Sequence, residues 1–233
     1  MAGTRAPLAF ESGPGAPARP LLLAHRGHRP AGPENSRRSV VAAFDVADGA
    51  EVDVIVAADG TAVLRHDDRM PGGFPVHALS VADMRRLGRL SADDLPTFGD
   101  VLDALGRRLA RGVWNVELKV PGAARALRPF AGRLEGVVFT SFFAAEVLEA
   151  KACFPGQPSG LLASRAPIPY VPPGTDLLSV RHTALAAIRS AHPDARLYAW
   201  TVNDAEAAAR ARAAECEAWI GDDVLALRRF AGG

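Results

Sequence analysis

The chain has 233 residues and a mass of 24.5 kDa, and 48% of its residues are apolar and 23% charged. This composition excludes a chain that is disordered throughout and predicts one globular domain with a large core. The formal net charge of +1 does not suggest a strongly basic protein that binds nucleic acid.

The first residues of the chain and its two cysteines bear on the cellular location of the protein. Residues 1–19 are rich in Ala, Pro and Gly, and we expect a flexible tail there, before a domain over residues 20–233. The apolar run at 20–24 is shorter than the core of a signal peptide, about 7–15 residues. Cys153 and Cys216 form no CxxC motif, which predicts reduced thiols. We therefore expect a cytoplasmic protein without stable membrane insertion. Nothing in the sequence indicates an oligomeric state.

Short apolar runs alternate with amphipathic stretches along the first half of the domain. The apolar runs have the length of strands and end near polar residues. In the stretches between these runs, apolar residues recur at helical spacing. The expected order is strand 21–24, helix 34–47, strand 51–56, turn 58–60, strand 62–65, helix 81–90, helix 98–109 and strand 113–120.

The same alternation continues to the end of the chain, with one exception. Residues 167–173 are rich in proline and cannot form an ordinary helix. Asp204 is expected to cap the helix that follows it. The expected order is helix 123–134, strand 136–141, helix 144–152, strand 159–163, strand 176–180, helix 183–191, strand 196–202, helix 204–215, strand 218–220 and helix 224–230.

Repeated strand–helix units predict parallel strands that are buried on both faces. Eight strands remain when the excursion at 62–65 is set aside. An open doubly wound sheet and a closed barrel both fit this order. Eight units in about 210 residues favour a compact (β/α)8 TIM barrel.

The chemistry of such a barrel lies at the carboxyl ends of its strands. Glu51 and Asp53 are two residues apart and therefore point to the same face of a strand. With Glu117 they would form three convergent carboxylates, which suit one divalent cation that prefers oxygen ligands, Mg²⁺ or Ca²⁺. The alternative is that Glu51 and Asp53 lie on a solvated edge or pair with arginines.

Four further residues at strand ends could take part in catalysis. His25 and His66 could act as general acid and general base near neutral pH, or each could merely close its strand. Only two of the 27 basic residues are lysines, so Lys119 is notable: it could stabilise an anion or simply reach solvent. Trp200 could stack on a substrate or pack in the core.

A series of short motifs in chain order resembles the glycerophosphodiester phosphodiesterase family. The resemblance covers nearly the whole chain after the tail. The motifs are His25-Arg26-Gly27, Pro33-Glu34-Asn35-Ser36, Glu51-Val52-Asp53-Val54, Asp59-Gly60, His66-Asp67, Leu95-Pro96-Thr97-Phe98, Asn115-Val116-Glu117-Leu118-Lys119, Ser141-Phe142 and Ala199-Trp200-Thr201-Val202-Asn203.

The resemblance implies a (β/α)8 barrel that hydrolyses glycerophosphodiesters to sn-glycerol 3-phosphate and an alcohol with a divalent metal. Its small-molecule substrate would be a phosphodiester, and nucleic acid would not be a partner. The roles implied are as follows: Glu51, Asp53 and Glu117 hold the metal, His25 and His66 are the acid–base pair, Arg26 and Lys119 bind the phosphate, Trp200 packs against the alcohol, and Glu34 and Asn35 support the site.

The chain departs from the family pattern at three places. The segment between His66 and Pro96, which forms a cap in the family, is short. The last strand ends Ile220-Gly221-Asp222-Asp223 instead of Thr-Asp-x-Pro, and the fifth unit is rich in proline. A smaller cap leaves room for a different head group.

Two other functions stay open. A related barrel could cleave lysophospholipid or sphingolipid head groups, which requires an apolar entrance, and the 70–76 loop offers only Phe74 and Val76. A barrel that binds a phosphorylated ligand without catalysis should have lost one of the histidines or carboxylates, and this chain keeps them all.

Overall fold

The computed structural model describes residues 19–232, and the predicted tail lies outside this range except for Arg19. Arg19 forms an ion pair with Asp48, with 2.6 Å between Nη1 and Oδ2. The strands are β1 Leu21–His25, β2 Gly49–Val56, β3 Ala62–Leu64, β4 Val113–Leu118, β5 Val137–Ser141, β6 Ser159–Ala163, β7 Leu177–Arg181, β8 Leu197–Trp200 and β9 Ala218–Gly221. The α-helices are α1 Arg37–Val46, α2 Val81–Gly88, α3 Phe98–Leu105, α4 Ala123–Ala126, α5 Ala144–Cys153, α6 Leu185–Ala191, α7 Ala205–Ala213 and α8 Val224–Ala231.

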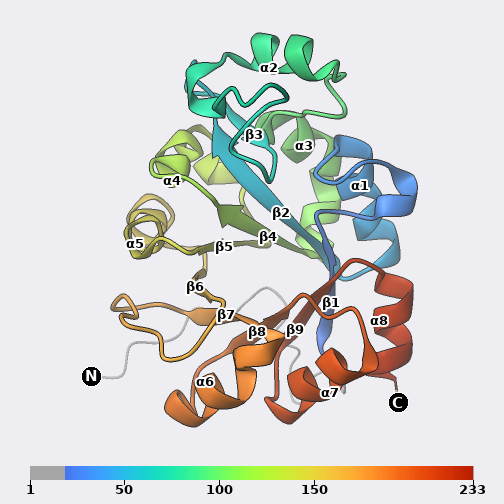
Figure 1. The fold of residues 1–233 in the computed structure, drawn as a ribbon, viewed down its shortest axis with the longest axis vertical. Coiled ribbons are helices and arrows are strands. Elements are labelled where there is room, and N and C mark those ends of the chain that lie inside the picture. The colour runs from blue at the N-terminus through green and yellow to red at the C-terminus, as the bar shows by residue number, and fades with distance from the viewer. Residues whose placement is uncertain (1–18, 233) are drawn as a thin grey trace.

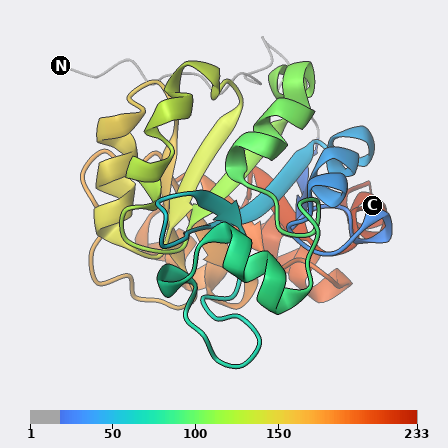
Figure 2. The same ribbon diagram turned by 90° about the horizontal axis from the view of Figure 1, so that it is seen from above.

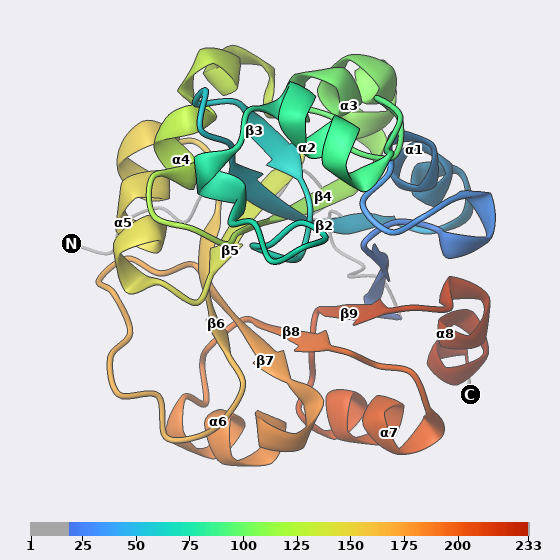
Figure 3. The same cartoon turned by 45° about the horizontal axis from the view of Figure 1, so that its top comes forward.

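Eight parallel strands close into a barrel. Their order is β1-β9-β8-β7-β6-β5-β4-β2, and the pairing of β1 with β2 completes the ring. The ninth strand, β3, runs antiparallel to β2 outside this ring. Figures 1 and 3 show the strands around a common centre with the helices outside them. The predicted TIM barrel is therefore confirmed, and the open sheet is excluded.

Side chains alternate between the inside of the barrel and the layer beneath the helices. The lower interior is filled by a buried apolar cluster that includes Leu23, Val113, Val138 and Tyr198. The outward residues of the same strands join the helices in the main core. Above the lower cluster the inward positions become polar, and this change creates the site.

The helices begin and end where local chemistry requires. Helix α1 starts at Arg37, later than the spacing predicts, because the Ser36 side chain accepts a hydrogen bond from the N–H of Ser39 and caps it. Helix α3 ends at Gly106, whose φ of 49° suits glycine, and the chain continues as a 3-10 helix. The predicted helix over 123–134 is likewise split into α4 and a 3-10 helix. The fifth unit, residues 164–176, has no helix, as its prolines predict.

The short segment after β3 has a small core of its own. It contains a 3-10 helix at Val76–Ala78 and the helix α2. Met70, Val76, Val81 and Met84 pack there against Ile55 of β2. Figure 2 shows this segment extending beyond the barrel. Between residues 19 and 232, no helix has both the length and the apolar character needed to span a bilayer. The expected cytoplasmic location stays a prediction.

The two thiols are expected to react very differently. Both cysteines are free, Cys153 is half-buried and Cys216 is buried. Burial raises the pKa of Cys216 to about 12, so almost no thiolate forms at pH 8. We expect a chromogenic disulfide reagent to label Cys216 at least about 100-fold more slowly in the native protein than after unfolding. Equal rates in the two states would contradict the buried position.

Candidate active site

The site begins at a tight turn after β1. Arg26 has a positive φ of 58°, and Gly27 follows with a φ of 90°. A Cβ atom on Gly27 would lie 2.6 Å from the Ser39 Oγ and 2.9 Å from the Val40 backbone nitrogen, so only glycine fits. This turn directs the His25 and Arg26 side chains over the mouth of the barrel. Asn35, also at a φ of 58°, returns the chain to the same place, since its N–H donates to the Arg26 carbonyl at 2.8 Å.

Three carboxylates meet at the carboxyl ends of two neighbouring strands. The register pairs Asp53 of β2 with Glu117 of β4, and Glu51 lies two residues before Asp53 on the same face. One oxygen from each carboxylate lies within 4.8 Å of the others. Glu51 and Asp53 are only 5% and 1% exposed. The donor set consists of carboxylate oxygens, which fits one hard divalent cation.

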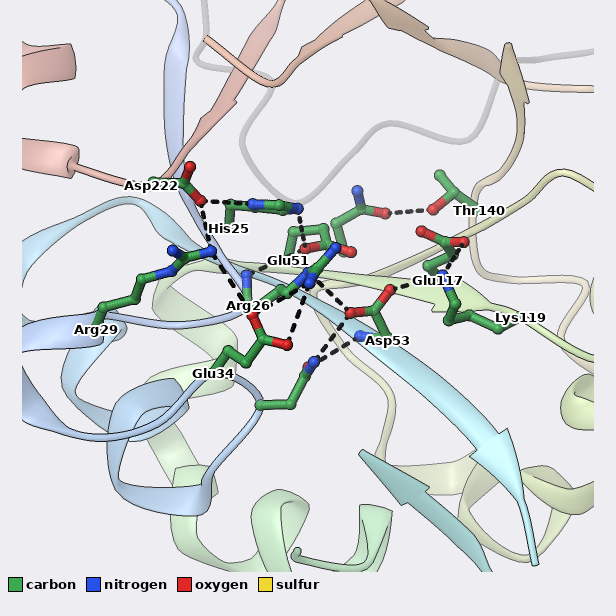
Figure 4. Close-up of polar contacts among 12 residues, drawn as sticks. His25, Arg26, Arg29, Glu34, Glu51, Asp53, Glu117, Lys119, Thr140 and Asp222 are labelled. Atoms are coloured by element: carbon green, nitrogen blue, oxygen red, sulfur yellow. Dashed lines mark hydrogen bonds and ion pairs between the residues drawn. The ribbon is translucent and has the colours of Figure 1, made fainter. Parts of the chain in front are cut away.

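Two cations and one amide hold this carboxylate cluster (Figure 4). Arg26 Nε lies 3.2 Å from Asp53 Oδ2, and the Lys119 ammonium lies 3.2 Å from both Asp53 Oδ1 and Glu117 Oε1. The Asn35 amide donates to Asp53 Oδ2 at 2.9 Å and accepts the Asp53 backbone N–H at 3.0 Å. Asp53 is therefore fixed on both sides.

Burial and mutual repulsion disfavour charge on the carboxylates. Burial, together with the charges of Asp53 and Glu117, raises the pKa of Glu51 well above its ordinary range. Burial and Asp53 also raise the pKa of Glu117, although Lys119 opposes this. With all three carboxylates ionised, they and the two cations would carry one net negative charge. A divalent metal would turn this into one positive charge and would so favour the ionised form of the carboxylates.

His25 belongs to a hydrogen-bonded chain that the sequence reasoning missed. His25 Nδ1 lies 2.7 Å from Asp222 Oδ1, and His25 Nε2 lies 3.9 Å from Glu51 Oε2. Asn203 binds Asp222 twice, donating to its Oδ2 at 2.6 Å and accepting its backbone N–H at 2.9 Å. Arg29 lies 2.9 Å from Asp222 Oδ1. The hydrogen bond from His25 lowers the pKa of Asp222 to about 2, which keeps it ionised.

The position of Asp222 could have drawn attention in the sequence. It follows the last strand, where carboxyl ends carry function, and the unusual ending at residues 220–223 marks it. What the sequence does not reveal is that closure of β9 onto β1 brings Asp222 beside His25, 197 residues earlier.

A cavity of about 270 Å³ opens above these groups. His25 and His66 both line it, and so do Arg26 and Lys119. Trp200 and Phe142 form an aromatic wall with their rings edge to face, 5.8 Å apart. His66 Nδ1 lies 2.8 Å from the Asp67 carboxylate, which supports its orientation. The two histidines thus share one space with the carboxylate cluster.

The structure brings together every residue that the sequence predicts for the site. Asp53 and Asn35 lie just beneath the cavity, and Glu34 lies at its edge, where it contacts Arg26 and Arg29. Trp200 is half-buried: it lines the cavity wall and also packs against the apolar cluster in the lower interior. The alternative of carboxylates on a solvated edge is excluded by their burial, while the pairing with an arginine is present at Arg26.

The comparisons with known proteins agree with this geometry. Residues 25–127 match the model of the glycerophosphoryl diester phosphodiesterase family. This segment belongs to that family. The resemblance found in the sequence is thus confirmed, and the matched segment contains the predicted site residues from His25 to Lys119. A comparison with curated proteins finds no match.

Solved structures of glycerophosphodiester phosphodiesterases share the fold. One is an Oleispira antarctica phosphodiesterase in complex with the product sn-glycerol 3-phosphate, with a TM-score of 0.73, 20% identity and coverage of 92% of this chain and 98% of the other. A Parabacteroides distasonis enzyme has a TM-score of 0.76 and 21% identity, covering 92% and 97%. A Thermotoga maritima enzyme has a TM-score of 0.72 and 21% identity, covering 90% and 97%.

Proposed function

We propose that this protein hydrolyses glycerophosphodiesters to sn-glycerol 3-phosphate and an alcohol, using a divalent metal and histidine acid–base catalysis. The observation that carries the proposal is that one cavity is lined by His25, His66 and the carboxylates of Glu51 and Glu117, with Asp53 directly beneath. The family match over residues 25–127 supports this activity. So does the sn-glycerol 3-phosphate bound to the Oleispira antarctica phosphodiesterase of the same fold.

Glu51, Asp53 and Glu117 would hold one Mg²⁺ or Ca²⁺ ion. A bound cation would polarise the phosphate and offset the negative charge that develops on its oxygens. Arg26 and Lys119 carry the remaining positive charge of the site and would contact the phosphate directly. Glu34 and Asn35 support these groups through Arg26 and Asp53. Trp200 would pack against the alcohol part of the substrate.

The two histidines would move the protons. One takes the proton of the attacking water or substrate hydroxyl as the new P–O bond forms, and the other gives its proton to the alkoxide that leaves as the old P–O bond breaks. Attack by a substrate hydroxyl would form a cyclic phosphate first, which water then opens to sn-glycerol 3-phosphate. His25 suits such a role because Asp222 occupies its Nδ1 and leaves Nε2 on the side of the carboxylate cluster. The number of protons is conserved in this exchange.

The proposal is tested by assaying the purified full chain with glycerophosphocholine, glycerophosphoethanolamine and an aryl phosphodiester, each with Mg²⁺, Ca²⁺, Mn²⁺ or EDTA. We expect metal-dependent release of sn-glycerol 3-phosphate that falls at least about 100-fold in His25→Ala. His192→Ala is the matched control, because His192 lies after α6 and does not line the cavity. Activity that persists in EDTA, or in His25→Ala, would contradict the proposal.

One observation favours lysophospholipids as a second candidate substrate. Phe142 lines the cavity and is 46% exposed, and the adjacent Phe143 is equally exposed, so the entrance has an apolar side. Of the two apolar residues noted in the 70–76 loop, Phe74 is exposed and Val76 is buried. Faster choline release from lysophosphatidylcholine than from glycerophosphocholine would favour the lipid.

A further inference from the structure

The floor of the cavity carries polar groups that the reaction itself does not use. Asn115 of β4, Thr140 of β5 and Ser179 of β7 all line the cavity and are at most 1% exposed. Asn115 lies two residues before Glu117 on the same face of β4, so it lies deeper in the barrel than the carboxylate cluster. These three side chains therefore form an uncharged polar part of the cavity wall, with Asn115 deeper in the barrel than Glu117.

Two of these groups have hydrogen-bonding capacity left over. The Thr140 hydroxyl donates to Asn115 Oδ1 at 3.0 Å, which turns the Asn115 amide nitrogen toward the remaining space. Asn115 Nδ2 and Ser179 Oγ have no hydrogen-bond partner among residues 19–232. Leaving a buried polar group without a partner is costly, so buried groups of this kind usually serve a ligand or a water.

The cavity wall also has apolar side chains. Leu162 of β6 and Ile220 of β9 also line the cavity, and Leu162 pairs in register with Ser179. A group bound here would meet hydrogen-bonding side chains on one side and aliphatic side chains on the other. A short polyol fits such a wall, because rotation about its C–C bonds can turn its hydroxyls toward one side and its C–H groups toward the other.

We propose that Asn115 and Ser179 bind the free hydroxyl groups of the glycerol unit. This inference rests on the proposed function and adds the direction in which the substrate lies. The glycerol unit enters the barrel first, the phosphate stops at the carboxylate cluster, and the alcohol head group points past Phe142 and Trp200 toward solvent. Asn115 and Ser179 thus determine specificity for the part of the substrate that all glycerophosphodiesters share.

The test compares two ligands with the same phosphate. The full chain, supplied with Mg²⁺ or Ca²⁺, is titrated in a calorimeter with sn-glycerol 3-phosphate and with propyl phosphate, which lacks both hydroxyls. We expect the wild type to bind sn-glycerol 3-phosphate at least about tenfold more tightly. Ser179→Ala and Asn115→Ala should each reduce this ratio toward one by weakening only the affinity for sn-glycerol 3-phosphate.

Ser159→Ala provides a matched control. Ser159 on β6 is also buried, and its hydroxyl also has no partner within residues 19–232, but it does not line the cavity. The ratio should stay at the wild-type value in this variant. Ser179→Ala should melt no lower than the wild type, because it removes a hydroxyl that has no hydrogen-bond partner in the part of the chain that the structure describes.

The outcomes separate this inference from the proposed reaction. The inference would be overturned if the wild type binds sn-glycerol 3-phosphate and propyl phosphate equally well, or binds neither. It would also be overturned if neither Ser179→Ala nor Asn115→Ala changes the ratio of the two affinities. If glycerophosphocholine is still hydrolysed in that case, the proposed function stands without it. A tenfold ratio in a protein that hydrolyses no diester would support the hydroxyl subsite and contradict the proposed reaction.

Discussion

Replacing Asp53 with asparagine is expected to lower turnover of glycerophosphocholine and the affinity for the divalent cation at least about 100-fold each. Asp53 is the central member of the carboxylate cluster, because it contacts Arg26, Asn35 and Lys119 at the same time. The amide keeps the size of the side chain but removes its charge. Titration of Mg²⁺, Ca²⁺ and Mn²⁺ by calorimetry, together with the hydrolysis assay, measures the effect.

Asp45→Asn is the control for this substitution. Asp45 lies on α1, where it pairs with Arg108 at 3.1 Å, and its side chain is 58% exposed. Its loss should leave both the metal affinity and the turnover at the wild-type value, since an exposed ion pair contributes little. If Asp53→Asn also retains near-normal metal affinity, the cluster is held together by Arg26 and Lys119 alone and is not a metal site.

Asp222→Ala is expected to lower kcat about 100-fold while KM changes much less. The carboxylate accepts the hydrogen bond of His25 Nδ1 and so determines which ring nitrogen is free to act in the cavity. Asp222 itself does not line the cavity, so it is a positioning residue. The ¹⁵N chemical shifts of the His25 ring should show the proton leaving Nδ1 in this variant, and Asp222→Asn should restore part of the activity.

The neighbouring Asp223 offers a matched comparison. Its carboxylate accepts hydrogen bonds from the N–H groups of Leu225 and Ala226 at 2.9 and 3.0 Å and caps α8. Asp223→Ala should cost about 1 kcal/mol of stability and leave kcat unchanged. Equal kcat values in the Asp222→Ala and Asp223→Ala variants, or an unchanged His25 spectrum in Asp222→Ala, would contradict the positioning role.

The sequence allows the barrel and the charged part of the site to be predicted because both depend on short patterns. Glu51 and Asp53 are two residues apart, and that spacing alone places them on one face of a strand. The alternation of strands and helices predicts parallel strands, the number of eight units favours a barrel over an open sheet, and the prolines at 167–173 identify the one unit without a helix.

Contacts between distant segments could not be predicted in this way. The pair of His25 and Asp222 forms only when β9 closes the ring beside β1. In the sequence, nothing distinguishes Ser179 from any other serine in an apolar strand. Its position in the cavity wall depends on the register of β7 with β6, which the sequence pattern does not give. The ends of α1 and α3 were less predictable than their existence, because a capping hydroxyl and a glycine determine them.

The two halves of the closed barrel contribute different kinds of side chain to the cavity. All three carboxylates, both catalytic-site cations and both histidines come from residues 25–119, inside the segment that matches the family. The later strands supply Ser179, Trp200 and the exposed Phe142, which surround the space left for the substrate. The charged groups and most of the uncharged walls of the cavity therefore come from separate stretches of the chain, and Asn115 is the uncharged lining residue that the first stretch adds. Under the proposed function, substitutions of Phe142, Ser179 or Trp200 would change which diester is accepted without altering the three carboxylates, the two cations or the two histidines.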